Sequence, residues 1–103
     1  MGNYMKALIA LLALTAIASA QNYYAGNLYG AKVYFFDDDR GYFGLYTSRG
    51  DHTPGNIYIS KDIPTSWMIQ NLAHELCHLR QDVARKPLNE KECCIAAHQG
   101  ACK

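Results

Sequence analysis

Residues 66–85 decide the fold, and they read SWMIQNLAHELCHLRQDVAR. Apolar side chains recur in this stretch at spacings of three and four residues, at Ile69, Leu72, Leu76, Leu79 and Val83. This period is typical of an α-helix with one apolar stripe along its length. We therefore predict a helix over residues 66–85 whose stripe packs against the rest of the domain.

The middle of this helix carries an HExxH motif, in which His74 and Glu75 are followed by His78. This spacing places the two imidazoles on one helical face, one turn apart, where they can hold two corners of a tetrahedral zinc ion. Glu75 lies beside them and can accept a proton without being a ligand. Both histidines fall about 160–220° from the centre of the apolar stripe, so we expect them to face away from the sheet.

Three segments before the helix have the composition of β-strands. Residues 31–36 and 42–47 are rich in aromatic and β-branched side chains, and residues 56–60 alternate between polar and apolar. A turn at residues 37–41 and a loop at residues 48–55 separate them, which suits an antiparallel meander. If residues 56–60 form an edge strand, an extended peptide can pair with them by β-addition.

The segment after the helix predicts a second, shorter helix. Lys86 and Pro87 interrupt the apolar pattern, and Asn89 is a suitable cap for a helix over residues 90–98. A strand-rich half followed by two helices is an α+β arrangement. The predicted fold is therefore a small antiparallel sheet, then the HExxH helix, then a short second helix.

A catalytic zinc site requires a third protein ligand and keeps one position open. The extended motif HExxHxxGxxH is absent, because Gln81 stands in place of the glycine and Ala84 in place of the third histidine. We therefore expect the third ligand on the second helix, which carries Glu90 and Glu92. Each glutamate has an alternative role, because Glu92 stands at capping-box spacing from Asn89 and Glu90 can interact with the helix dipole.

The pattern HExxHxxQ at residues 74–81, followed by the ExE pair at residues 90–92, resembles small gluzincin-type zinc metallopeptidases. The resemblance extends over residues 32–98. It implies that a strand-rich half precedes the motif helix and that Glu75 acts as the general base. It further implies that zinc is held by His74, His78 and the second glutamate of the pair, Glu92.

Four cysteines, at positions 77, 93, 94 and 102, indicate covalent cross-links. Adjacent Cys93 and Cys94 are poorly placed to bridge each other, because a disulfide needs their Cβ atoms to converge. Two complete pairings remain, Cys77–Cys93 with Cys94–Cys102 or Cys77–Cys94 with Cys93–Cys102. Either pairing ties the HExxH helix to the second helix. Thiolate ligation of zinc by Cys77, Cys93 or Cys94 is the alternative, which an oxidising compartment disfavours.

The start of the chain has the features of a secretory signal peptide. Lys6 supplies a positive charge, residues 7–18 are apolar or small, and residues 18–20 read ASA, a small-x-small cleavage site. The apolar run is short for a membrane span, and an uncleaved anchor is the alternative. We therefore predict a signal peptide over residues 1–20 and a single domain over residues 21–103, secreted or periplasmic.

Composition limits the function classes. The chain is 50% apolar and 18% charged with a formal net charge of +1, which excludes disorder and argues against a nucleic-acid-binding surface. The sequence predicts an exported zinc metallopeptidase acting on peptides or proteins, with no nucleic-acid partner and no membrane contact after signal cleavage. The alternatives are a zinc-stabilised, disulfide-linked binding module without activity and a disulfide-stapled interaction protein without metal.

The remaining histidines and tyrosines have less specific roles. His52 and His98 are expected at the surface or at a helix end. The tyrosines are mostly strand residues with packing roles, and either Tyr46 or Tyr58 is a candidate to face the zinc.

Overall fold

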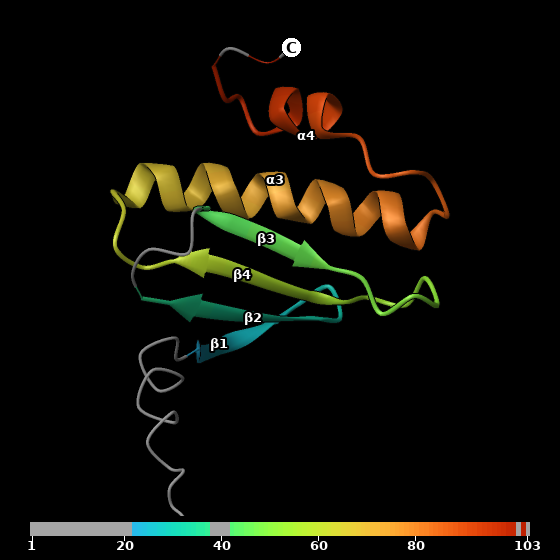
Figure 1. The fold of residues 1–103 in the computed structure, drawn as a ribbon, viewed down its shortest axis with the longest axis horizontal. Helices are drawn as coiled ribbons and strands as arrows, with labels where there is room; N and C mark the ends of the chain where they lie inside the picture. Colours follow the sequence, from blue (N-terminus) through green and yellow to red (C-terminus); the bar gives the residue numbers. More distant parts are fainter. Residues whose placement is uncertain (1–21, 38–41, 101, 103) are drawn as a thin grey trace, which may run out of the picture.

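The computed structural model describes residues 22–37, 42–100 and 102. The predicted signal peptide and most of the predicted turn at residues 37–41 lie outside these ranges. Four strands precede two helices (Figure 1), which confirms the α+β class. The elements are β1 (Asn22–Leu28), β2 (Ala31–Phe36), β3 (Gly44–Thr47), β4 (Asn56–Ser60), α3 (Thr65–Val83) and α4 (Glu90–Ala96).

The sheet is mixed, with the strand order β1-β2-β4-β3. β1 and β2 form an antiparallel pair, β4 runs parallel to β2, and β3 pairs antiparallel with β4. The predicted meander is therefore wrong at β4, which lies between β2 and β3 instead of at an edge. The apolar side chains of β4 suit this central position. Ile57 and Ile59 are almost completely buried, and a strand with a neighbouring strand on each side is better shielded from solvent than an edge strand.

Strand β1 was not predicted from the sequence. It joins β2 through a two-residue turn, in which Tyr29 and Gly30 both have positive φ angles, 52° and 88°. Turns of this kind match the twist of a hairpin and favour glycine. β1 itself has a weak sequence signal, because it contains Gly26 at a register shift and most of its residues are exposed.

Helix α3 packs its apolar stripe against β3 and β4 (Figure 1). The core is formed by Ala31, Val33, Tyr46, Ile57, Ile59 and Leu79, with Met68, Leu72 and Leu76 partly buried against it. The ends of the predicted stripe are exposed, since Ile69 is 64% and Val83 46% accessible. The helix of 19 residues is about 28 Å long, whereas a strand of five residues spans about 17 Å. The sheet therefore covers only the middle of α3.

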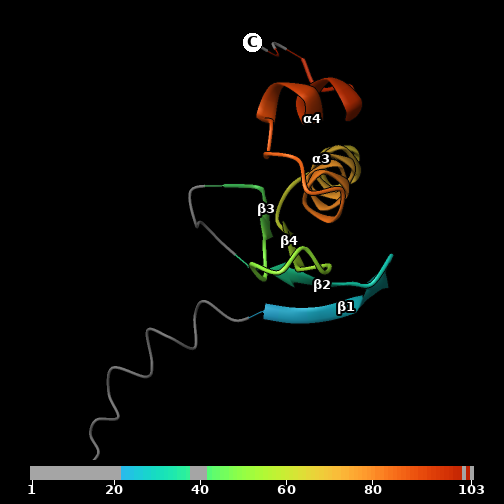
Figure 2. The ribbon, with the colours of Figure 1, turned by 90° about the vertical axis from the view of Figure 1, so that its right-hand side faces the viewer.

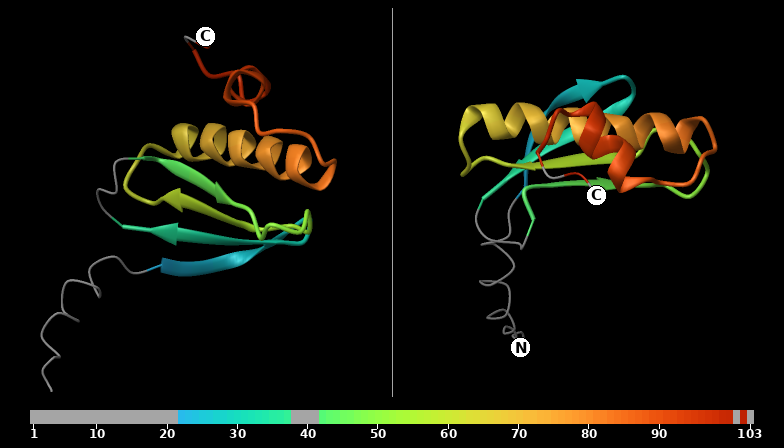
Figure 3. Two further views of the ribbon diagram at one scale, coloured as in Figure 1. Left: turned by 45° about the vertical axis from the view of Figure 1, so that its right-hand side comes forward. Right: turned by 90° about the horizontal axis from the view of Figure 1, so that it is seen from above.

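Helix α4 lies on the side of α3 that faces away from the sheet (Figure 2), and it crosses over α3 when seen from above (Figure 3). The Cys77–Cys93 disulfide joins the two helices, and a second disulfide links Cys94 to Cys102. The first of the two predicted pairings is therefore confirmed, and it leaves no cysteine free for zinc.

Two disulfides in so short a chain fit an extracellular location. Among the described residues, neither helix is both long enough and apolar enough to cross a membrane. With α4 on one side and the sheet on the other, α3 is covered on two faces. This arrangement explains how one helix can bury the polar side chains of Glu75, His78, Gln81 and Asp82.

Candidate metal centre

Two histidines of α3 and the first residue of α4 meet at one point. Glu90 Oε1 lies 2.7 Å from His74 Nε2 and 3.1 Å from His78 Nε2. One ligand atom from each of these three residues lies within 4.8 Å of the others. This is close to the separation of about 3.3 Å between two ligands of one tetrahedral ion with bonds of about 2 Å. In the described part of the chain, His74, His78 and Glu90 therefore form a group that could hold a metal ion.

The structure does not bring Glu92, the third ligand implied by the family resemblance, to this group. Its carboxylate accepts a hydrogen bond from Gln81 Nε2 at 2.6 Å, and its backbone N–H donates to Asn89 Oδ1 at 2.9 Å. Residues two apart on a helix point about 200° apart, so only one of the two glutamates can face the imidazoles. Glu90, the alternative left open by the sequence, takes that place.

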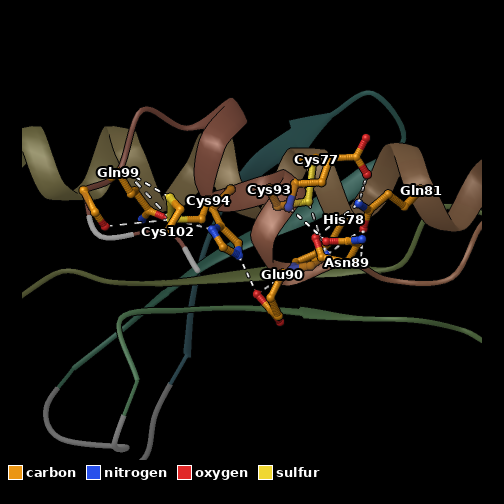
Figure 4. Close-up of polar contacts among 12 residues, drawn as sticks. Cys77, His78, Gln81, Asn89, Glu90, Cys93, Cys94, Gln99 and Cys102 are labelled. Carbon is orange, nitrogen blue, oxygen red and sulfur yellow. Dashed lines mark hydrogen bonds and ion pairs between the residues drawn. A yellow bond between two sulfur atoms is a disulfide. The ribbon is translucent and has the colours of Figure 1, made fainter.

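The second nitrogen of each imidazole contacts a glutamine. His74 Nδ1 lies 2.8 Å from Gln99 Oε1, and His78 Nδ1 lies 2.9 Å from Gln81 Oε1 (Figure 4). Hydrogen bonds of this kind orient metal-binding histidines in proteins, because they leave the Nε2 lone pair free for the ion. Sequence reasoning gave neither glutamine a role. The one sequence feature that could have indicated such a role is the position of Gln81, three residues after the motif.

Glu90 and Glu75 lie in different electrostatic environments. Burial acts to raise the pKa of Glu90, but the hydrogen bonds and charges of His74 and His78 outweigh it and lower that pKa. Burial raises the pKa of Glu75, and the nearby Glu90 adds to the rise although the two histidines oppose it. Glu90 is thus suited to remain a charged ligand, and Glu75 to exchange a proton.

A cavity of about 280 Å³ opens beside the three residues. Strand β3 forms one wall, and Glu75, His74 and His78 line the helix side. The apolar part of the lining comes from Phe43, Leu45 and Leu88, and the Trp67 ring packs on Phe43 with the ring centroids 5.7 Å apart. The group is therefore accessible to a ligand of modest size.

The edge strand at this cavity is β3, so residues 56–60 do not meet the condition under which they could pair with a peptide. β3 stands at one end of the strand order and approaches α3 closely. A Cβ atom added to Gly44 would lie 3.0 Å from Glu75 Oε2 and 3.2 Å from Asn71 Oδ1. Glycine at this position lets the strand backbone come close to the predicted general base.

Neither candidate tyrosine directs its hydroxyl at the metal group. Tyr46 lines the cavity, but its hydroxyl donates to Asp82 Oδ2 at 2.7 Å and accepts from the Gly55 N–H at 2.9 Å. Burial, together with the carboxylate of Asp82, raises the pKa of Tyr46 to about 12. Tyr58 is stacked on Tyr34, with 5.3 Å between the ring centroids. Both side chains therefore have structural roles.

The other two histidines also lie outside the centre. His52 Nδ1 lies 3.0 Å from the Asp82 backbone oxygen and 3.3 Å from its Oδ1, at the C-terminal end of α3. His98 is exposed just beyond α4, with a positive φ of 57°. Both positions agree with the roles expected from the sequence, at the surface or at a helix end.

Comparison of this chain with family models, with curated proteins and with solved structures returned no match. The function must therefore be inferred from the site itself. Its informative features are the His-His-Glu group, the buried glutamate beside it and the cavity that both share.

Proposed function

We propose that this protein is an exported zinc metallopeptidase of the gluzincin type. In this proposal His74, His78 and Glu90 hold the ion, and Glu75 is the general base. The observation that carries it is the convergence of two Nε2 atoms and one carboxylate within 4.8 Å, beside a cavity that also exposes Glu75.

The donor set fits zinc. Two imidazoles and one carboxylate are a common ligand set of catalytic zinc, which keeps one position open. Solvent or a substrate can approach the group from the side of Glu90. The Glu90 side chain is 81% exposed, whereas the His78 side chain is only 4% exposed. When bound, zinc polarises a carbonyl oxygen and makes a water molecule acidic near neutral pH.

Glu75 can move the proton that peptide hydrolysis requires. It is buried at 5% exposure, and a hydrogen bond from the backbone of Tyr46 helps to hold its carboxylate against β3. As the general base, Glu75 accepts a proton from the attacking water and passes it to the nitrogen of the leaving amine. Its raised pKa brings its proton affinity closer to that needed near neutral pH.

Strand β3 can bind the substrate backbone. It pairs with β4 on one side only, and it forms the cavity wall opposite the histidines. An extended peptide that adds to this edge would run alongside the metal group. The apolar side chains of Phe43, Leu45 and Leu88 in the lining favour substrates with apolar residues near the cleaved bond.

The localisation is part of the proposal. Residues 1–20 have the pattern of a cleavable signal, and the two disulfides fit the oxidising compartment to which such a signal leads. We infer a secreted or periplasmic protein whose substrates are peptides or unfolded proteins.

The decisive experiment compares the wild type with Glu75→Gln on a broad mixture of unstructured peptides. The variant keeps the size of the side chain but removes the base, so it should retain zinc and lose cleavage. If the variant cleaves as fast as the wild type, the assigned mechanism is wrong. If both hold zinc and neither cleaves any peptide, the protein is instead a zinc-stabilised binding module.

A further inference from the structure

The side-chain amide of Gln81 is held at both of its ends. This residue of α3 is 4% exposed. Its Oε1 lies 2.9 Å from His78 Nδ1 and 3.0 Å from the Asn89 backbone N–H. Its Nε2 lies 2.6 Å from the carboxylate of Glu92 and 3.3 Å from the Asn89 backbone carbonyl (Figure 4).

These partners determine which way the Gln81 amide points. A backbone N–H can only donate, and a carboxylate or a backbone carbonyl can only accept. The atom next to the Asn89 N–H must therefore be the oxygen of Gln81, and the atom next to Glu92 must be its nitrogen. The oxygen and the nitrogen of the amide therefore cannot exchange places, because each partner can only donate or only accept a hydrogen bond.

The fixed oxygen of Gln81 in turn decides where His78 carries its proton. An amide oxygen can only accept, so Nδ1 of His78 must donate to it. The other near neighbour of this nitrogen is Cys93 Sγ at 3.5 Å, and a disulfide sulfur is a weak acceptor that competes poorly with an amide oxygen. In the neutral ring, a proton on Nδ1 leaves the lone pair on Nε2, where the ion would bind. Without the ion, Nε2 lies 3.1 Å from Glu90 Oε1, a second acceptor that competes with Gln81 for the proton.

We propose that Gln81 is a positioning residue that fixes the tautomer and the orientation of His78 for zinc, and that Glu92 and Asn89 hold Gln81 in place. This inference rests on the proposed zinc site. It gives Glu92 a role that differs from ligation, since Glu92 acts on the metal group through Gln81 and His78. It also links the two helices, because the start of α4 provides both the ligand Glu90 and the anchor for Gln81.

Gln99 contacts His74 Nδ1 in the same way at 2.8 Å. Its amide lacks a comparable anchor, however, because no backbone N–H is bonded to its oxygen among the hydrogen bonds of the described residues. The two glutamines thus differ in how firmly they are held. Gln99→Met provides a matched comparison for Gln81→Met, and we expect the smaller loss of zinc affinity at Gln99.

The test uses three variants and the zinc dissociation constant, measured by competition with a chromophoric chelator. Gln81→Met keeps the length of the side chain but removes the acceptor, and it should weaken zinc binding about 10–100-fold. Gln81→Glu keeps an acceptor for His78 but sets two carboxylates against each other at Glu92, so it should also weaken binding. The double variant Gln81→Glu/Glu92→Gln restores one acceptor and one donor at this contact, and it should return the affinity to within about threefold of the wild type.

A second measurement reports on His78 without zinc. Without an ion, Nε2 of His78 lies 3.1 Å from the Glu90 carboxylate, which also accepts a proton, so the measurement uses Glu90→Ala. Imidazole ¹⁵N NMR of this metal-free variant at about pH 8.5, above the usual pKa of histidine, should show the proton of His78 on Nδ1. Gln81→Met in the same background should show a mixture of the two tautomers. A His78 of Glu90→Ala that lacks the Nδ1 proton would overturn the inference whether or not zinc binds.

The outcomes separate this inference from the proposed function. If the wild type binds no zinc, the proposed function fails, and the NMR result alone decides the role of Gln81. If the wild type binds zinc and both single variants at Gln81 bind it equally well, the positioning role is wrong. If Gln81→Met does not fold, the comparison between Gln81→Glu and the double variant still decides, because a purely steric role predicts no rescue.

Discussion

Glu75 and Glu90 line one cavity, and their surroundings shift their pKa values in opposite directions. Burial raises the pKa of Glu75, whereas hydrogen bonds from His74 and His78 lower the pKa of the exposed Glu90. Pairs of carboxyl groups with divergent pKa values are characteristic of sites that assign them different roles. In the proposed function, this difference separates the proton acceptor Glu75 from the metal ligand Glu90.

Glu90 and Glu92 provide a matched pair for testing the ligand assignment. Glu90→Gln replaces the carboxylate that faces both imidazoles, so we expect zinc affinity to fall at least about a hundredfold, at or beyond the upper end of losses from supporting residues. Glu92→Gln leaves an amide oxygen that can still accept from Gln81, so it should change the affinity only a few-fold. Chelator competition measures both values, and the reverse order would return the ligand role to Glu92.

The raised pKa of Glu75 predicts how pH affects the stability of the metal-free protein. Because the folded state holds this proton more tightly than the unfolded state, ionised Glu75 destabilises the fold at neutral pH. The stability that its protonation contributes is present below the unfolded-state pKa and is lost as the pH rises through the folded-state pKa. We therefore expect Glu75→Gln to be more stable than the wild type at neutral pH.

This difference should shrink as the pH falls below about 4, the range in which Glu75 becomes protonated in the unfolded state as well. Urea denaturation of the metal-free wild type and of Glu75→Gln at several pH values measures it. Since the two proteins share every other titrating group, the gap between the two curves reports Glu75 together with its electrostatic interactions with His74, His78 and Glu90. A gap that does not depend on pH would mean that burial does not raise the pKa of Glu75 in the folded protein.

The Cys77–Cys93 disulfide should support metal binding as well as stability. It ties the helix that carries both histidines to the helix that carries Glu90. The double variant Cys77→Ala/Cys93→Ala should lose about 2–4 kcal/mol of unfolding free energy and bind zinc more weakly. Cys94→Ala/Cys102→Ala is the control, because it leaves this connection between α3 and α4 intact. Zinc affinity in Cys77→Ala/Cys93→Ala equal to that of the wild type would show that packing alone holds Glu90 in place.

Tyr46 should stabilise the fold through its hydroxyl group. Tyr46→Phe leaves the buried Asp82 carboxylate and the Gly55 N–H each without this partner, which should cost about 1–3 kcal/mol. The pKa of about 12 also predicts that wild-type stability falls between about pH 10 and 12, since the unfolded tyrosine ionises first. The variant should lack this part of the alkaline loss, as measured by the midpoint of denaturation.

The sequence predicted those features that depend on local spacing. His74 and His78 share a face because one helix carries both, and Asn89 caps α4 because its side chain reaches the Glu92 N–H nearby. The choice of Glu90 over Glu92 depends instead on how α4 is rotated about its axis against α3. That rotation follows from contacts across the two helices, among them the Cys77–Cys93 disulfide.

The position of β4 in the sheet likewise depends on contacts between residues that are distant in the sequence. The alternation of Asn56–Ser60 predicts a strand, but only its pairing with both β2 and β3 shows that it is central and parallel to β2. For this reason the sequence left open whether residues 56–60 form an edge, and the structure places β3 there instead. The position of Gln81 after the motif is visible in the sequence, but its proposed role could not be predicted, because that role requires His78, Asn89 and Glu92 to be placed together in space.

The close approach of β3 to Glu75, the proposed general base, predicts the effect of a single methyl group. In Gly44→Ala the added Cβ would lie 3.0 Å from Glu75 Oε2 and 3.2 Å from Asn71 Oδ1, so the carboxylate must shift by a few tenths of an ångström. Gly44 touches none of the three proposed ligands at this distance, so zinc affinity should stay within a few-fold of the wild type. The rate constant kcat should nevertheless fall about tenfold or more, because proton transfer depends on the position of the base.

Gly100→Ala is the matched control for this variant, since a Cβ at Gly100 meets nothing within 4 Å. It should leave both zinc affinity and kcat unchanged. Zinc titration and steady-state kinetics on one peptide substrate measure the two quantities for each protein. If Gly44→Ala lowers zinc affinity and kcat in parallel, the methyl group disturbs the metal ligands, and Glu75 does not act as a separately positioned base. If neither value changes, β3 does not constrain Glu75, and the edge strand has no part in positioning the proton acceptor.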